Sequence, residues 1–362
     1  MVGRYEVTVL CPHSPGAARE EILDGVRVVR YRYAPVRLET MVNDGGIITN
    51  LKRARWKWLL VPAFFLTQWW ALSRILRTYR PNIIHAHWLI PQGIVTAAAH
   101  RNIPFLVTSH GADLFAINGA LFTWLRGRVL SKAKAVTVVS EAMKRRLQTD
   151  HPRTLIDVIP MGVDFTSLFT PLDQEARSSD FILFVGRLVE KKGAIHLINA
   201  MPLILAVKPY ARLHVVGSGP EKERLAAAVR KLQLEYCISF LGAREQKELP
   251  SLFRKAAVFA APFVEALSGD QEGLGLVVAE AIACHCPVVV GNVPAVYDLV
   301  DPNLASIVPQ ANPAALADAI IAVLNDPRAA HKKAIALRRN LEANVSWQTV
   351  AQKYSDLLFR FS

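Results

Sequence analysis

The chain has 362 residues, more than one hydrophobic core usually organises, so its length predicts two domains. It is 52% hydrophobic and only 20% charged, yet its formal net charge is +13. Such an excess of cations suits nucleic acid, an anionic membrane surface or phosphorylated substrates. The sequence has no zinc-finger spacing, no ribonucleoprotein motif and no alternation of basic and aromatic residues, so we expect no nucleic-acid partner.

Four cysteines, Cys11, Cys237, Cys284 and Cys286, are too few for a disulfide framework in a chain of this size. Cys284 and Cys286 flank His285, but no second pair of ligands accompanies them and the surrounding run is apolar. We therefore expect small buried thiols and no metal site. Together with the absence of a signal-peptide pattern at the start of the sequence, this predicts a cytoplasmic location.

Short β-rich apolar runs alternate with helical patterns along the chain. In the first half they lie at 5–10, 83–88, 105–110, 135–140 and 157–162, and in the second half at 181–186, 211–217, 238–242, 257–262 and 287–291. Apolar runs without strict alternation, separated by helices, are typical of parallel strands buried on both faces. The pattern predicts an α/β fold with two doubly wound, Rossmann-like domains.

The longest apolar stretch is 58–72 (WLLVPAFFLTQWWAL), with basic residues on both sides from Lys52 to Arg80. Fifteen residues that include a proline and a glutamine are short for a membrane span. Two interpretations remain open: a helix packed on a sheet, or a helix lying among lipid headgroups. In the second, the tryptophans act as anchors and the cations of 52–80 bind an anionic membrane surface. The tryptophans concerned are Trp56, Trp58, Trp69 and Trp70.

The segment after IPMGVD (159–164) reads FTSLFTPLDQEARSSD and has no strong apolar period, as expected of a linker. It places the first domain at 1–165 and the start of the second at 166. Since functional loops in such sheets follow the carboxyl ends of strands, three strand ends provide candidates. They are TSHGAD with His110 and Asp113, GRLVEKKG with Gly186, Arg187, Lys191 and Lys192, and VGSGP with Gly217 and Gly219. His85 and His87 also end a strand and are candidates for lining a pocket.

The stretch 271–280 (QEGLGLVVAE) has two glutamates, Glu272 and Glu280, around an apolar run. We expect a buried helix that starts near Gly275 and directs its free amides and positive dipole end at an anion. Glu280 then lies just over a turn inside the helix, where a carboxylate can accept hydrogen bonds from a ribose diol. Arginine and lysine at 187, 191 and 192 suit a diphosphate, as a planar fork and as point charges.

Taken together, VGRLVEKKG, VVGSGP, EGLGLVVAEAIA with PVVVG, IPMGVD and TSHGAD resemble glycosyltransferase family 4 over nearly the whole chain. The glutamate pair, about 80 residues after the Arg–Lys loop, is the specific part of this resemblance. It implies a retaining, nucleotide-sugar-dependent glycosyltransferase of the GT-B fold, with two domains facing a central cleft. It also implies that 166–345 bind the nucleotide sugar and that a last helix within 346–362 returns to the first domain.

By the same resemblance, Arg187 and Lys192 bind the donor diphosphate, and Leu274 and Gly275 offer it their amides. Glu280 binds the ribose, while Glu272 contacts the transferred sugar and His110 reaches it from the first domain. Gly186, Gly217 and Gly219 line the donor pocket. The family needs no cofactor or metal, and the sequence has no Asp-x-Asp motif. The acceptor is expected to be a glycan or a lipid-linked group, for example in cell-envelope polysaccharide synthesis.

Against the family pattern, the first strand, glycine-rich loop and helix are missing from the given sequence, which begins at what corresponds to the second strand. His285 also stands where a glycine is common, and Pro294 and Ala295 stand where two glycines are common. Two alternatives therefore stay open beside the transferase. One is a truncated, non-catalytic homologue that binds nucleotide sugar or membrane, and the other is a GT-B epimerase or phosphorylase.

Overall fold

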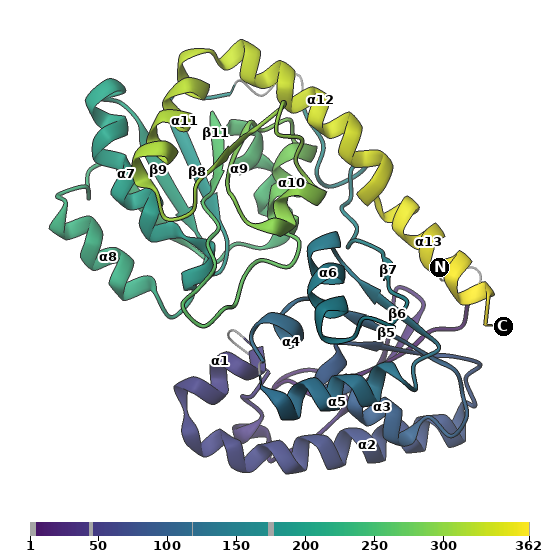
Figure 1. Ribbon diagram of the computed structural model, residues 1–362. Helices are drawn as coiled ribbons and strands as arrows, with labels where there is room; N and C mark the ends of the chain where they lie inside the picture. Colours follow the sequence, from purple (N-terminus) through teal and green to yellow (C-terminus); the bar gives the residue numbers. More distant parts are fainter. Residues whose placement is uncertain (1–4, 43–45, 118, 173–176, 362) are drawn as a thin grey trace. The chain divides into compact units, whose positions relative to one another are not determined.

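The computed structural model describes residues 5–42, 46–117, 119–172 and 177–361. The chain forms two compact units (Figure 1). Unit 1 comprises Met1–Val138, Lys144–Val158 and Ala351–Ser362, and unit 2 comprises Val139–Met143 and Ile159–Val350. The backbone thus passes between units at 138/139, 143/144, 158/159 and 350/351. The sequence-based boundaries at 165/166 and 345/346 correspond to the last two.

Unit 1 contains a four-stranded parallel sheet in the order β4-β5-β6-β7. Its strands are β4 (Ile84–His87), β5 (Phe105–Ser109), β6 (Ala135–Val138) and β7 (Asp157–Val158). Every residue of β5 is buried, as expected for a central strand covered on both faces. The connecting helices are α3 (Ile94–Ala99), α4 (Ala112–Phe115), α5 (Ala120–Leu130) and α6 (Glu141–Asp150).

A second, three-stranded sheet in unit 1 has the order β1-β3-β2. Strand β1 (Thr8–Pro12) pairs in parallel with β3 (Val26–Tyr31), and β2 (Glu20–Leu23) pairs antiparallel with β3. The β2–β3 hairpin turns at Asp24 and Gly25, which both have positive φ (47° and 80°). Two positive φ values in a row are typical of the two-residue turn that Asp-Gly favours.

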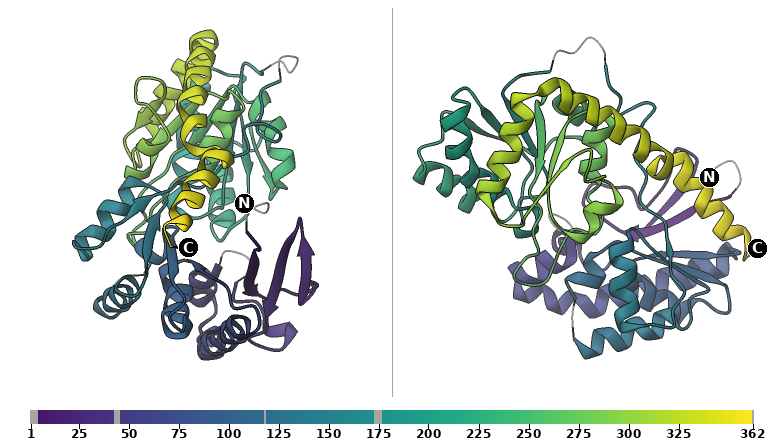
Figure 2. Two further views of the ribbon diagram at one scale, coloured as in Figure 1. Left: turned by 90° about the vertical axis from the view of Figure 1, so that its right-hand side faces the viewer. Right: turned by 45° about the horizontal axis from the view of Figure 1, so that its top comes forward.

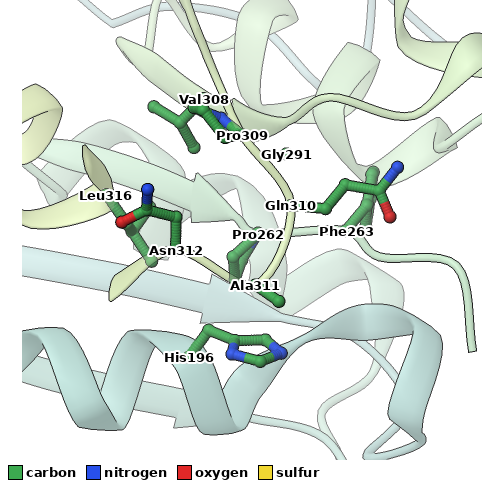
Figure 3. A pocket seen from close by; sticks show the side chains of 10 residues that line it. All are labelled: His196, Pro262, Phe263, Gly291, Val308, Pro309, Gln310, Ala311, Asn312 and Leu316. Atoms are coloured by element: carbon green, nitrogen blue, oxygen red, sulfur yellow. The ribbon is translucent and has the colours of Figure 1, made fainter. Parts of the chain in front are cut away.

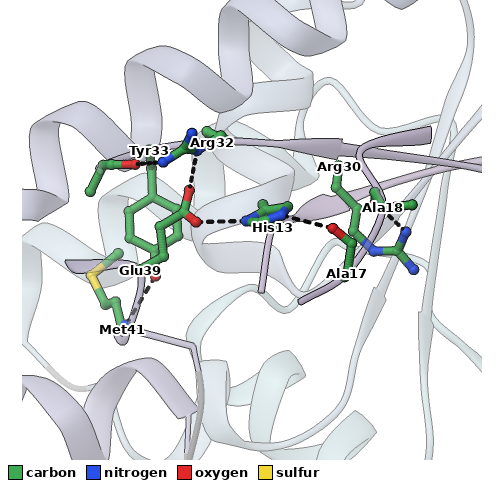
Figure 4. A network of polar contacts seen from close by, with 9 residues as sticks. His13, Ala17, Ala18, Arg30, Arg32, Tyr33, Glu39 and Met41 are labelled. Atoms are coloured by element: carbon green, nitrogen blue, oxygen red, sulfur yellow. Dashed lines mark hydrogen bonds and ion pairs between the residues drawn. The ribbon is translucent and has the colours of Figure 1, made fainter. Parts of the chain in front are cut away.

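A buried polar network ties this sheet to the segment before α1 (Gly46–Arg53) (Figure 4). His13 Nδ1 lies 2.6 Å from Glu39 Oε2, and His13 Nε2 lies 3.0 Å from the carbonyl oxygen of Ala17. Arg32 Nε donates to the other oxygen of Glu39 at 3.1 Å. The Glu39 side chain is fully buried. Its contacts with His13 and Arg32 compensate for the hydrogen bonds to water that a carboxylate loses on burial.

The apolar stretch 58–72 lies in a 3₁₀ turn, Arg55–Leu60, followed by α2 (Val61–Thr78). One face of α2, with Phe64, Leu72 and Ile75, is buried, and the helix contacts β1, β3 and α3. Its other face exposes large apolar side chains. The buried face agrees with the first interpretation, a helix packed on a sheet, and the headgroup interpretation stays a prediction. The helical stretch Arg55–Thr78 is longer than expected, and by length and composition alone it could cross a membrane.

Unit 2 is built on a six-stranded parallel sheet in the order β10-β9-β8-β11-β12-β13. The strands are β8 (Phe181–Val185), β9 (Arg212–Val216), β10 (Ile238–Gly242), β11 (Val258–Ala261), β12 (Val288–Gly291) and β13 (Ser306–Val308). The helices are α7 (Ala194–Val207), α8 (Lys222–Lys231), α9 (Leu249–Lys255), α10 (Leu276–Ala283), α11 (Pro313–Asn325) and α12 (Pro327–Val345). Apolar residues of β8, β9, α7 and α11 form its main core.

The last helix, α13 (Trp347–Phe359), begins in unit 2 and continues into unit 1. Within unit 1 the Tyr354 hydroxyl lies 3.2 Å from Thr108 Oγ1, and its ring lies 5.2 Å from the His85 ring. Tyr354, near the C-terminus, thus packs against the carboxyl ends of β4 and β5.

Candidate functional site

The unit 2 sheet has a point at which its strand order reverses. From β8 the chain proceeds outward through β9 to β10, and it then returns to β11 on the other side of β8. Loops that leave two such neighbouring strands diverge to opposite faces and leave a crevice at the carboxyl edge of the sheet, where ligands of α/β proteins bind. The loops concerned are 186–193 after β8 and 262–275 after β11, and they contain most of the candidate residues.

An ion pair joins these two loops. Lys192 Nζ lies 2.5 Å from Glu272 Oε2, and the two side chains are only 15% and 14% exposed. Burial by itself raises the pKa of Glu272, but the charges of Lys192 and Lys191 and the hydrogen bond from Lys192 outweigh it and lower the pKa to about 2. Glu272 is therefore ionised at neutral pH, and the pair is a fixed charge couple at the crevice.

A second ion pair, which the sequence did not indicate, supports the first. Lys191 Nζ donates to Asp270 Oδ1 at 3.0 Å and to the carbonyl oxygen of Gln271 at 3.1 Å. It links the same two loops one residue away from Lys192. Lys192 Nζ also lies 4.7 Å from the centroid of the Phe263 ring, within the range of a cation–π contact. Asp270 could have been found as the acid that precedes Glu272 by two residues, whereas Phe263 gave no signal.

Glycines allow the backbone to approach closely around this edge. Gly193, with φ +69°, closes the loop after Lys192, and a Cβ built on it would lie 1.8 Å from the Pro262 carbonyl oxygen. A Cβ on Gly217, with φ +139°, would lie 1.9 Å from the Gly186 carbonyl oxygen, and one on Gly219 would lie 2.3 Å from that of Leu188. The predicted glycines therefore set the spacing between the loops after β8 and β9.

Helix α10 begins at Leu276 with Gly275 as its N-cap (φ +86°), close to the predicted start. Leu274 is buried, and the first backbone amides of a helix have no partner within it. Glu280, in the second turn, is largely buried, and this burial raises its pKa. Gln246 Nε2 donates to Glu280 Oε1 at 3.4 Å, a contact that the sequence gave no means of finding.

Arg187 is exposed directly after Gly186, at the start of the loop that follows β8. The structure thus brings together Gly186, Arg187, Lys192, Gly217, Gly219, Glu272, Leu274, Gly275 and Glu280 on one edge of the unit 2 sheet. His110, the remaining predicted residue, belongs to unit 1.

His110 follows β5 directly and lies among histidines from β4. Its Nε2 lies 3.0 Å from His87 Nδ1, and the rings of His87 and His85 are 4.1 Å apart. Burial first, and His87 second, lower the pKa of His110 to about 4. Burial likewise lowers the pKa of His85, to about 3. These imidazoles are therefore neutral at pH 7 and can both donate and accept a hydrogen bond.

Asp113, the other candidate in TSHGAD, is buried and shapes the turn. Its carboxylate accepts from the Leu89 amide at 2.6 Å and from Ser109 Oγ at 2.8 Å. These contacts fix the backbone around His110. Asp113 therefore has a structural role in the motif that requires no ligand.

A small cavity of about 10 Å³ lies further along the carboxyl edge of the same sheet (Figure 3). It is lined by residues at or just after the ends of β11, β12 and β13, among them Pro262, Gly291 and Asn312, and by His196 of α7. A space of this size holds about one water molecule, so it is too small for a nucleotide.

Two of the four cysteines and two of the departures from the family pattern lie just beyond α10. Cys284 and Cys286 are buried and free, as expected, and burial raises their pKa values to about 12 and 11. His285 has φ +56°, in the left-handed region that favours glycine after a helix. The structure thus gives a physical reason why glycine suits this position. Pro294 begins a 3₁₀ turn, Pro294–Asp298, where its fixed φ is compatible.

Comparison with known families gives two matches that together span most of the chain. The model described as Glycosyltransferase Family 4 matches residues 1–167, and the model described as Glycosyl transferases group 1 matches residues 173–344. A GDP-mannose-dependent alpha-(1-6)-phosphatidylinositol monomannoside mannosyltransferase of Mycolicibacterium smegmatis is 28% identical over 99% of this chain and 91% of its own length.

A Corynebacterium glutamicum relative is the GDP-mannose-dependent monoacylated alpha-(1-6)-phosphatidylinositol monomannoside mannosyltransferase. It is 30% identical over 64% of this chain, and the match spans 63% of the relative. Among solved structures, sucrose-phosphate synthase from Thermosynechococcus elongatus has a TM-score of 0.80 at 22% identity, over 99% of this chain and 90% of the other. HepE of Anabaena in complex with UDP has a TM-score of 0.75 at 17% identity, over 98% and 100%. At these identities the likeness shows the fold alone, and it confirms the predicted GT-B class.

Proposed function

The chain belongs to the group 1 glycosyltransferases of family 4, and on that premise we propose that it transfers a sugar from a nucleoside-diphosphate sugar to an acceptor hydroxyl. The acceptor oxygen forms a bond to the anomeric carbon, the bond from that carbon to the diphosphate breaks, and the nucleoside diphosphate and a proton leave. We infer retention of configuration from the family resemblance. The observation that carries the proposal is the Lys192–Glu272 pair at the strand-order reversal of unit 2.

In this proposal the donor diphosphate binds between Arg187, Lys192 and the amides of Leu274 and Gly275. Arginine and lysine provide charge and hydrogen bonds to phosphate oxygens, and the start of α10 adds its dipole. Glu280 accepts hydrogen bonds from the ribose. Since its pKa is raised by burial, a ribose diol that replaces Gln246 as its partner would stabilise the ionised form.

Glu272 and His110 are assigned to the reacting sugar. Glu272 is ionised and held in place by Lys192, so it can orient sugar hydroxyls and oppose the positive charge that develops at the anomeric carbon. His110 is neutral and can donate a hydrogen bond without adding a charge. The leaving diphosphate is stabilised by Arg187 and Lys192 as its charge grows, which is electrostatic stabilisation of the transition state by fixed groups. We propose that no metal ion is required.

For the acceptor we propose a lipid-linked or polysaccharide group, reached from a cytoplasmic position on the membrane surface. The Corynebacterium and Mycolicibacterium relatives are named for phosphatidylinositol-linked acceptors, and α2 presents an exposed aromatic face beside cations. One of the expected cations does not contribute: Lys57 is buried, and its Nζ donates to Asn50 Oδ1 at 2.9 Å and to the Thr40 carbonyl oxygen at 3.0 Å.

The donor site is tested by thermal unfolding with UDP, GDP and their hexose conjugates, because a ligand that binds only the folded protein raises Tm. We expect one of the two nucleotides to raise Tm, and R187A to weaken that nucleotide's binding about tenfold. Arg212, at the opposite end of β9, provides the matched control R212A, for which binding should be unchanged. Absence of any nucleotide effect in the wild type would contradict the proposal.

Catalysis is tested with E272A in the same preparation. We expect E272A to abolish transfer of the sugar from the donor found above, whereas nucleotide binding remains within a fewfold of wild type. Turnover by E272A at the wild-type rate would contradict the catalytic role assigned to Glu272. Wild-type nucleotide binding without turnover on lipid-linked or glycan acceptors would favour a non-catalytic homologue.

A further inference from the structure

A second exposed aromatic face, which the sequence did not single out, lies on α5. Leu121 and Trp124 are 63% and 59% exposed, and they lie three residues apart on one side of the helix. Arg128 follows on the same side, and its guanidinium carbon lies 5.7 Å from the centroid of the Trp124 ring. Exposed large apolar side chains that gather on one face mark an interaction surface more often than isolated ones do.

Helix α2 presents the same arrangement. Leu66 and Trp70 are 65% and 60% exposed, and Arg74 lies 5.9 Å above the Trp70 ring. In each helix a tryptophan is followed four residues later by an arginine that stacks on it. The aromatic ring and the cation are therefore exposed side by side. Tryptophan and arginine side chains suit a membrane–water interface, where an apolar layer meets a charged one.

The two helices belong to one layer of unit 1. Helix α3 contacts both α2 and α5. Helices α3 and α5 connect strands that follow one another in the four-stranded sheet, β4 to β5 and β5 to β6, whereas α2 leads into β4 from the three-stranded sheet. Since crossovers between parallel strands are right-handed, helices that connect strands added in one direction cover the same face. Figures 1 and 2 show α2, α3 and α5 side by side along one side of this unit. We call the exposed residues Leu66, Trp70, Arg74, Leu121, Trp124 and Arg128 the paired-helix face.

The charge of the chain is concentrated in the segment that builds this layer. Residues 45–140 contain twelve lysines and arginines but one acid, Asp113, so they hold +11 of the net charge of +13. Asp113 is buried and hydrogen-bonded inside unit 1. An exposed face with tryptophans and arginines, in a segment whose one acid is buried, is complementary to an anionic, partly apolar surface. A lipid bilayer with acidic headgroups has both properties.

We propose that the paired-helix face is the membrane-binding surface of this protein, with α5 as its second half. The proposal extends the membrane-linked acceptor proposed above and identifies the partner as an anionic lipid bilayer. Two helices side by side define a plane, whereas one helix alone could rotate about its axis. The second contact therefore fixes the orientation of unit 1 on the membrane. The second contact also raises the membrane affinity. Once the tryptophan of one helix has inserted into the bilayer, the tryptophan of the other is held beside the bilayer at a high effective concentration.

The test uses the full-length protein, without donor, and vesicles of phosphatidylcholine with or without phosphatidylglycerol. Co-sedimentation should show binding to the anionic vesicles that weakens as salt is added. We expect W124A on α5 to weaken binding about tenfold, as much as W70A on α2. R128Q should weaken it about fivefold, which corresponds to about 1 kcal/mol per cation at the surface. L121S provides a second variant at the α5 position if W124A unfolds.

Tyr236, an exposed aromatic of unit 2, provides the control: Y236A should bind vesicles as the wild type does. Wild-type vesicle binding by W124A and L121S, with W70A impaired, would overturn the role of α5. Absence of vesicle binding at low salt would overturn the membrane assignment. An oligomer of the wild type that W124A dissociates would instead identify the face as a contact between copies. Because no nucleotide is present, failure of the proposed transferase activity would leave this result standing.

Discussion

The histidines at the ends of β4 and β5 show how burial controls the charge of single residues. His110 has its pKa lowered to about 4 by burial and by His87, whereas an imidazole in an unfolded chain titrates near 6.5. As pH falls from about 6.5 towards 4, the unfolded chain binds a proton that the folded His110 does not bind. Stability is therefore complete above that window and is lost as pH falls through it.

We expect the free energy of unfolding of unit 1, measured in urea, to decrease between about pH 6.5 and 4. H110N should decrease less steeply, because each proton taken up only by the unfolded chain costs up to about 1.4 kcal/mol per pH unit. Tryptophan fluorescence reports on this unit, since six of the seven tryptophans lie in it. Equal slopes for the wild type and H110N would contradict the lowered pKa.

A sequence motif can indicate single residues where the signal is local, whereas a partner supplied by the tertiary fold leaves no local signal. Glu272 and Lys192 were predicted on resemblance, and the structure places them 2.5 Å apart. Gln246, which donates to Glu280, lies 34 residues earlier in a polar turn, where nothing in the local pattern distinguishes it from a solvated glutamine. Asp113 was counted as a candidate for chemistry, but its hydrogen bonds to Leu89 and Ser109 are structural.

At the scale of elements, the ten predicted strand regions coincide with β1 and β4 to β12, because buried parallel strands are continuous apolar runs. Strands β2 and β3 were not predicted, although Asp24-Gly25 is a strong hairpin signal. The charged residues of EEILDGVRVVRY obscured it, since this hairpin has an exposed face. β13, with three residues, is too short for periodicity to show.

The loop after β8 depends on a glycine that no other residue can replace without strain. Gly193 combines φ +69° with a distance of 1.8 Å between a built Cβ and the Pro262 carbonyl oxygen. We expect G193A to destabilise unit 2 by about 3 kcal/mol, measured as the loss of hydrogen-exchange protection in β8 and β11. Gly242 has a similar φ of +73° but nothing within 4 Å, so G242A should cost only about 1 kcal/mol. Equal costs would show that the close approach does not matter.

At the scale of the whole molecule, the two α/β sets predicted from the sequence are the two units of the structure, and the family comparison confirms the fold class. The linker pattern placed the first boundary at 165/166, seven residues after the passage at 158/159. Composition shows where apolar periodicity stops, but residues such as Phe165 and Phe169 still pack into unit 2. Which unit a residue belongs to depends on its tertiary contacts, and these cannot be predicted from the local sequence pattern.

A prediction for the intact protein concerns metal ions. Since Arg187 and Lys192 are assigned to the diphosphate, the increase in Tm caused by the bound nucleotide should be the same in EDTA and in magnesium. The comparison uses the wild type with whichever of UDP or GDP binds. A Tm increase that disappears in EDTA and returns with magnesium would contradict the assignment.

The Lys192–Glu272 pair has a consequence for selectivity. In the ligand-free protein the cation already has an internal anion beside it, so any incoming phosphate must compete with a tethered carboxylate. A tethered competitor acts at a high effective concentration, so we expect it to weaken the binding of free phosphate and other small anions at Lys192. In the proposed function, a nucleoside diphosphate that also engages the start of α10 and Glu280 gains enough to displace it. The pair would then select against small anions before any sugar is recognised.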